Sequence, residues 1–93
     1  MYEYPLFQEK PLIPTKDAQR EMGEIGIDLW QAKEVLEQGY DCSASKRAAN
    51  IIERCFYKKN KEIRVVVVLV EWKVEGQIES FWRIIHVGKT GGH

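Results

Sequence analysis

The sequence predicts an α+β fold in which two N-terminal helices pack on a three-stranded antiparallel β-meander. Residues 65–70 are six consecutive apolar residues flanked by charged ones, the pattern of a strand that is buried on both faces. Two helical segments with apolar stripes precede this run, and a glycine-containing turn and a second apolar strand follow it. A short domain has one place for a doubly buried strand, so residues 65–70 are expected at the centre of the sheet.

The size and charge of the chain limit its function. The 93 residues are expected to form a single domain (1–93) with an extended arm (1–14), a globular core (15–90) and a flexible tail (91–93). Positive and negative side chains balance at 14 each, so no field of the whole molecule attracts nucleic acid or a membrane. Without a signal peptide or a spanning segment, we expect a cytoplasmic protein with reduced thiols at Cys42 and Cys55. A disulfide is the alternative, as in thermophilic hosts.

Local signals define the N-terminal half. All three prolines lie within residues 1–14, where they forbid a continuous helix and predict an extended arm. Thr15 is the expected N-cap of a first helix with apolar positions four and three residues apart, Ala18, Met22 and Ile25. Asp28 is expected to cap a second helix, with Gln31 completing a capping box and Gly39 following the last turn.

The C-terminal half is expected to form the strands. Residues 51–57 fit a helical period but are also rich in strand formers. We predict a strand, because residues 58–61 resemble a turn and the buried strand needs an antiparallel neighbour. Glu75-Gly76 predicts a tight hairpin, and Gly88, Gly91 and Gly92 are expected to end the ordered structure after the last strand. The strands are therefore expected near residues 50–57, 62–73 and 79–88.

A basic strip runs through this neutral chain. Residues 46–64 contain seven Lys and Arg against two Glu. Residues 58–61 of this strip fit a solvated hairpin tip, with phosphate contact as the alternative, whereas loops held by a scaffold commonly carry sites. Lys46 and Arg47, in a polar crossing loop at residues 40–50, are therefore candidate nucleic-acid-binding residues, together with Arg54 and Lys89.

Segment 17–90 resembles a family of small proteins related to the BrnT and RelE toxins of bacteria and archaea. The matching motifs are Gly26-Ile27-Asp28, Ala32 with Val35-Leu36, Tyr40-Asp41-Cys42-Ser43-Ala44-Ser45-Lys46-Arg47 and Arg83-Ile84-Ile85-His86-Val87-Gly88-Lys89-Thr90. BrnT and RelE are ribonucleases that cut messenger RNA and are neutralised by an antitoxin. The resemblance therefore implies RNA as substrate and an antitoxin-like protein as partner. Relatives commonly begin the first helix with His-Ala, whereas this chain has Asp17-Ala18, so the role of that histidine is lost or altered.

Metal-free RNA cleavage needs a base for the ribose 2′-hydroxyl proton, cations for the charge on phosphate, and an acid for the leaving oxygen. Arg47, Arg83 and His86 are the candidate catalytic residues, since imidazole titrates near neutral pH. Strand alternation sends Arg83 and His86 to opposite faces unless a bulge intervenes, so we expect weak cleavage or none, following the arginines and not His86. The structural alternatives are a hydrogen-bonded strand-end histidine and sheet arginines, Arg64 and Arg83, paired with Glu71 or Glu79.

Two other classes of function stay open. A metal site could be assembled from Asp41, Cys42, Cys55 and His86, but their spacing matches no known ligand motif, so we expect neither metal nor cofactor. Cys42 as a nucleophile lacks a nearby base. A non-catalytic protein-interaction module, or a homodimer, would use exposed aromatic anchors, drawn from Trp30, Tyr40, Tyr57, Trp72, Phe81 and Trp82. Absence of RNA binding at low salt would favour this class.

Overall fold

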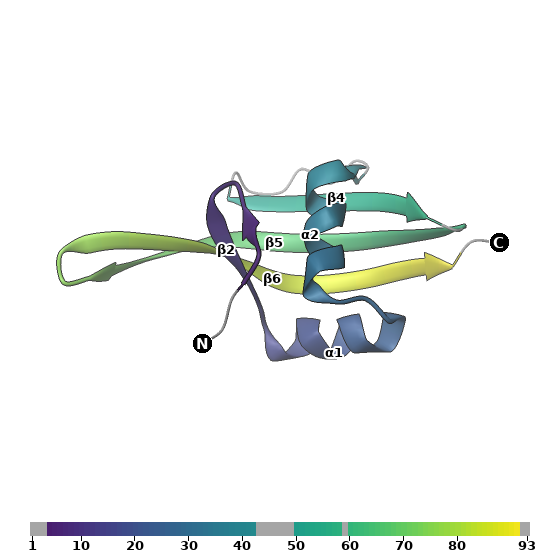
Figure 1. Cartoon of the computed structure of the whole chain (residues 1–93), viewed down its shortest axis with the longest axis horizontal. Coiled ribbons are helices and arrows are strands. Elements are labelled where there is room, and N and C mark those ends of the chain that lie inside the picture. The colour runs from purple at the N-terminus through teal and green to yellow at the C-terminus, as the bar shows by residue number, and fades with distance from the viewer. Residues whose placement is uncertain (1–3, 43–49, 59, 92–93) are drawn as a thin grey trace.

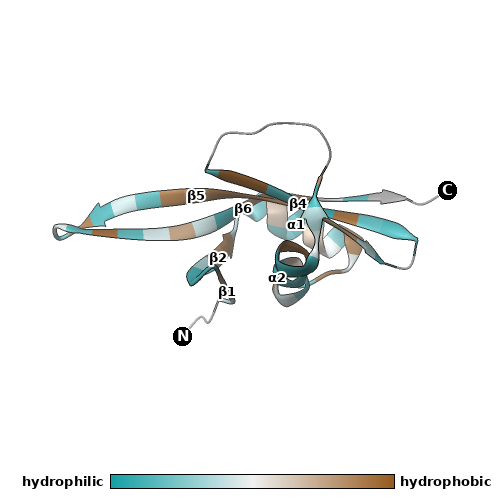
Figure 2. Cartoon of the chain, turned by 90° about the horizontal axis from the view of Figure 1, so that it is seen from above, coloured by the Kyte–Doolittle hydropathy of each residue, from teal (hydrophilic) through white to brown (hydrophobic). Residues whose placement is uncertain are grey.

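A computed structural model describes residues 4–42, 50–58 and 60–91. In this part of the chain two helices lie on one face of a curled, six-stranded mixed sheet (Figures 1 and 2). The elements are β1 (Leu6–Phe7), β2 (Lys10–Pro14), α1 (Lys16–Ile25), α2 (Leu29–Gln38), β3 (Tyr40–Asp41), β4 (Ile51–Lys58), β5 (Lys61–Val74) and β6 (Gln77–Gly91). The α+β class is therefore confirmed, whereas the three-stranded meander is wrong.

The strand order is β1-β2-β6-β5-β4-β3. β2 runs parallel to β6, and each other neighbouring pair is antiparallel. The predicted antiparallel strands β4, β5 and β6 are present, with Val65, Val66 and Val67 buried at the centre. Three short strands extend this unit at its edges, and they account for the error in the predicted sheet.

The N-terminal arm contributes two of these edge strands. Gln8 and Glu9 adopt φ angles of 50° and 65° between β1 and β2, a left-handed turn that these residue types rarely form. β2 then joins β6 through three residue pairs, beginning with Leu12 opposite Trp82. β2 lies between β1 and β6, but both of its pairings are short, so the missing N–H groups of Pro11 and Pro14 remove few sheet hydrogen bonds. Tyr40–Asp41, predicted as loop, forms β3 against β4.

Both helices begin and end near the predicted positions. Thr15 caps α1, accepting a hydrogen bond from the Ala18 N–H at 3.1 Å, and Gly26 ends it at φ 77°. Asp28 and Gln31 form the expected capping box of α2. Among the described residues, no helix is long and apolar enough to cross a membrane.

The helices cover one face of the sheet and form the main core with it. The buried members of this core are Phe7, Leu12, Ala18, Met22, Ala32, Val35, Leu36, Val65, Val67, Trp82, Ile84 and Val87. Neighbouring positions along β5 and β6 consequently face away from the helices, on a surface that we call the open face of the sheet. The candidate site lies on this open face.

The strand predictions are confirmed, with one correction at the C-terminal end. Residues 51–58 are a strand, and Glu75 and Gly76 form the β5–β6 hairpin with φ angles of 51° and 80°. The last strand was predicted to end near residue 88, but it does not end at Gly88. β6 continues past it and pairs with β5 as far as Gly91 opposite Lys61, because glycine keeps its backbone hydrogen bonds even where it adds no side chain to the packing.

Cys42 and Cys55 form a disulfide, so the expectation of reduced thiols is wrong. Tyr40 pairs with Cys55 across β3 and β4, and this register brings the two cysteines to a Cα–Cα distance of 5.4 Å, typical of a disulfide. A bond that closes a segment of this size stabilises a fold by about 3 kcal/mol, mainly by restricting the unfolded chain. Disulfides are rare in cytosolic proteins, so the bond lends no support to the cytoplasmic expectation.

Candidate anion site on the open face of the sheet

A β-bulge in β6 determines which side chains meet on the open face. Val66 pairs with His86 and Val67 with Ile84, so that Ile85 has no partner on β5. The bulge lets Ile84 and Val87, three positions apart, both point into the core, where they are 0% and 2% exposed. Regular alternation would send these two side chains to opposite faces.

The bulge also brings Arg83 and His86 to one face. Their partners on β5 are Val68 and Val66, which are two residues apart and therefore share a side of the strand. The prediction that Arg83 and His86 lie on opposite faces is wrong, and the reason is a bulge, the one exception that the prediction allowed.

A hollow of about 290 Å³ lies beside His86, and the described residues that line it are Arg64, His86, Gly88 and Lys89. We call it the basic hollow. Gly88 pairs with Arg64 across β5 and β6, and its missing side chain leaves the space. A Cβ at Gly88 would lie 3.1 Å from His86 Nε2, closer than nine in ten real Cβ contacts. The Nε2 edge of the imidazole therefore borders the basic hollow.

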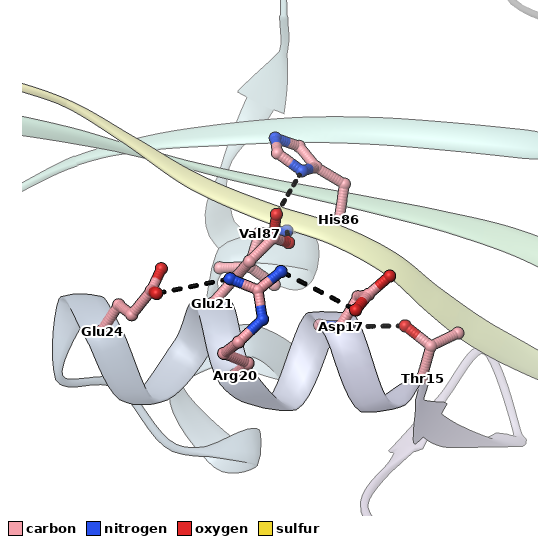
Figure 3. Close-up of polar contacts among 8 residues, drawn as sticks. Thr15, Asp17, Arg20, Glu21, Glu24, His86 and Val87 are labelled. Carbon is pink, nitrogen blue, oxygen red and sulfur yellow. Dashed lines mark hydrogen bonds and ion pairs between the residues drawn. The ribbon is translucent and has the colours of Figure 1, made fainter.

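The other ring nitrogen of His86 is held from α1. His86 Nδ1 lies 3.2 Å from Glu21 Oε2, and Glu21 Oε1 accepts a hydrogen bond of 2.9 Å from the Val87 N–H (Figure 3). Glu21 can reach this N–H because β2 pairs with β6 only over residues 82–84, so that the next part of the β6 edge is left to α1. The carboxylate both completes the sheet edge and fixes the imidazole.

Sequence reasoning missed Glu21, although a signal was present. Glu21 is three residues after Ala18 and four before Ile25, which places it within the apolar stripe of α1. A carboxylate in such a stripe needs a polar partner. The N–H of Val87 and the imidazole of His86 are those partners.

The two arginines of the open face have different surroundings. Arg64 Nε lies 3.2 Å from Glu53 Oε2, an ion pair by distance that lacks the alignment of a hydrogen bond. Its partner is thus Glu53 on β4 and not Glu71 or Glu79. The Arg83 guanidinium lies 5.5 Å from the centre of the Phe81 ring, a cation–π contact, and no ion pair joins it to a described residue. Arg83 therefore remains able to meet an anion.

The other predicted site residues are not brought together here. Arg54 donates to the Leu36 carbonyl at 2.8 Å and to Asp41 at 3.0 Å, so it fastens the end of α2 to β3. Lys46 and Arg47 lie outside the described residues. Lys89 is the one predicted phosphate-binding residue that the structure places at the basic hollow.

The described residues also bear on the metal, cysteine and aromatic sites that the sequence left open. No group of three or more His, Cys, Asp and Glu there could hold a metal ion, and the disulfide removes Cys42 and Cys55 as thiol ligands or nucleophiles. Of the aromatic anchors, Phe81 and Trp82 are both buried, 6% and 5% exposed, whereas Trp72 is 41% exposed.

Comparison of the chain with models of protein families, with curated proteins and with solved structures finds no match. The function is therefore argued from the site itself.

Proposed function

We propose that this protein binds RNA on the open face of its sheet and cleaves it at the basic hollow, with His86 as the general base. The observation that carries the proposal is the arrangement of His86, whose Nδ1 is held by Glu21 while its Nε2 borders a hollow lined by Arg64 and Lys89. The resemblance to BrnT and RelE points to the same substrate.

The chemistry uses groups at the hollow together with Arg83, which lies on the same face of the sheet. In the proposed step His86 Nε2 takes the proton of the ribose 2′-hydroxyl, and the 2′-oxygen forms a bond to phosphorus. The bond from phosphorus to the 5′-oxygen breaks, and that oxygen takes a proton from solvent. The products are a 2′,3′-cyclic phosphate and a free 5′-hydroxyl. Arg64 and Arg83 stabilise the negative charge that builds on the phosphate oxygens.

Glu21 has a positioning role in this step. A base whose second nitrogen is hydrogen-bonded to a carboxylate is held in one tautomer and one orientation, as in other base–carboxylate pairs. Because Glu21 is itself fixed by the Val87 N–H, the imidazole is oriented before RNA binds.

The test is cleavage of a labelled single-stranded RNA by the purified full chain in the presence of a chelator. His86→Gln should lower the cleavage rate by roughly 10² or more. Glu21→Gln should lower it by roughly tenfold or more, because the amide keeps an acceptor for Val87 but loses the charge that orients the imidazole. Glu24→Gln is the matched control: Glu24 lies one turn further along α1 and pairs with Arg20 (Figure 3).

Binding is measured separately from cleavage. Replacing Arg64 or Lys89 by Ala should each reduce the slope of log affinity against log salt by about 0.7, the value for one phosphate contact with a single strand. Equal cleavage by wild type and His86→Gln would contradict the catalytic proposal. No RNA binding at low salt would contradict the whole proposal and favour a protein-binding module.

A further inference from the structure

The β5–β6 hairpin extends beyond the rest of the sheet. β4 pairs with β5 only as far as Val68, and β2 pairs with β6 only from Trp82 onward. Residues 69–81 therefore form a two-stranded ribbon, which we call the β-arm, and Figure 1 shows it projecting from the body of the molecule. Its exposed apolar side chains include Trp72, Val74 and Ile78, which are 41%, 42% and 67% exposed. A two-stranded ribbon with apolar side chains in water is only marginally stable without a neighbour.

The β5 side of the β-arm has a free hydrogen-bonding edge. The Leu69 N–H donates to the Asn50 carbonyl at 2.8 Å, so the backbone groups of Leu69 face the side on which β4 lies. Since the direction alternates along a strand, the N–H and C=O groups of Glu71 and Lys73 face this same side, beyond the end of β4. Such an edge is a template for another strand.

The side chains along this edge are complementary in charge to those of a second, antiparallel copy of the same segment. Residues 70–74 read Val-Glu-Trp-Lys-Val, which is symmetric in chemistry about Trp72 except that the two charges are opposite. If two copies run antiparallel with their Trp72 residues opposite each other, Glu71 of each copy lies opposite Lys73 of the other. Val70 of each copy likewise lies opposite Val74 of the other. Glu71 and Lys73 are exposed and form no ion pair with any described residue of their own chain.

We propose that the protein forms a dimer by antiparallel pairing of residues 70–74 of β5 with the same residues of a second copy. The hydrogen bonds would run between Glu71 and Lys73, whose backbone groups face the edge, and the Trp72 pair would be the non-hydrogen-bonded position on the two-fold axis. The interface joins the two sheets into one continuous sheet through their β-arms.

The other edge of the β-arm does not offer this match. Residues 77–81 of β6 carry a single charged side chain, Glu79. No register of two such segments can place opposite charges across from one another, whereas the β5 register forms two ion pairs by symmetry. Charge complementarity therefore selects the β5 edge and a second copy of this chain as its occupant.

The test is the dissociation constant of the full chain, measured by sedimentation equilibrium at low salt. Glu71→Lys places two lysines opposite each other at both symmetric positions, and we expect the dissociation constant to rise by about tenfold or more. Lys73→Glu should have the same effect. The double variant Glu71→Lys with Lys73→Glu restores both pairs with exchanged signs, so it should dimerise as the wild type does. Glu79→Lys, which makes the same change of charge on the β6 strand of the β-arm, is the control and should have little effect.

Amide hydrogen exchange locates the interface independently. The Glu71 and Lys73 amides face solvent in the monomer and should become protected as the protein concentration passes through the dissociation constant. A chain that stays monomeric at millimolar concentration would overturn the proposal. A dimer that Glu71→Lys leaves intact, or one in which these two amides exchange freely, would overturn it equally. The basic hollow lies where β5 is paired with β4, away from the β-arm, so RNA cleavage can fail or succeed without changing any of these outcomes.

Discussion

Gly39 links α2 to β3, and we predict that Gly39→Ala is strongly destabilising for a reason unrelated to its φ angle. Its φ of −77° is open to any residue. A Cβ at this position, however, would lie 2.4 Å from the carbonyl oxygen of Cys55 and 2.4 Å from that of Val35. Both are backbone atoms, one on β4 and one in the last turn of α2, so neither can rotate away as a side chain would.

The size of the effect follows from these distances. Ordinary contact begins at 3.4 Å, so each oxygen must move by 3.4 − 2.4 = 1.0 Å relative to the new methyl group. Overpacking of this kind costs about 1–3 kcal/mol, and two contacts with backbone atoms place Gly39→Ala near the upper value. A loss of about 3 kcal/mol corresponds to a fall in Tm of roughly 12–24 °C in a domain of this size.

Thermal unfolding followed by circular dichroism measures the prediction. Gly23→Ala is the control, because Gly23 lies within α1 and a Cβ there meets nothing within 4 Å. Alanine at a helical position should stabilise by about 0.5–1 kcal/mol. A Gly39→Ala protein with the Tm of the wild type would refute the close approach of α2, β3 and β4 on which the reasoning rests.

Three further predictions concern the core, the β3 edge and the basic hollow. Val67→Asp should unfold the protein, because Val67 is 0% exposed and a buried unpaired charge costs several kcal/mol of a total near 5–15; Val74→Asp, at a half-exposed position of the β-arm, should still unfold cooperatively. The hydrogen bond from Tyr40 to Glu62 raises the pKa of Tyr40 above its ordinary value. The unfolded chain therefore loses its phenolic proton first, so the contribution of this hydrogen bond to stability should be constant below about pH 10 and decline above it. Urea unfolding should show this decline, which Tyr40→Phe should reduce. Gly88→Ala should fold normally but lose RNA cleavage, because its methyl group crowds the imidazole beside it; unchanged cleavage would argue against the hollow as the site.

The parts of the fold that could be predicted from sequence depend on local chemistry. Thr15, Asp28 and Gln31 cap helices through hydrogen bonds to residues three positions away, and the Glu75-Gly76 turn is determined by two φ angles. Each of these signals is complete within a few residues. The parallel pairing of β2 with β6 joins residues about seventy positions apart, and the left-handed turn before β2 uses Gln and Glu, so neither left a local signal.

Arg83 and His86 were predicted as site residues, but their placement on one face was not, since that geometry depends on one residue of β6 that has no partner on β5. In a regular strand, side chains alternate between the two faces, which would place Arg83 and His86 on opposite faces of β6. This alternation was the strongest argument against a site that contains both residues. The spacing that contradicts it was in the sequence, because Ile84 and Val87 are apolar residues three positions apart in a strand. A strand can bury both on one face only if an extra residue intervenes, and Ile85 is that residue. The extra residue also turns His86 to the open face, where its Nδ1 lies beside Glu21. The burial of both Ile84 and Val87 in the core therefore creates the candidate site.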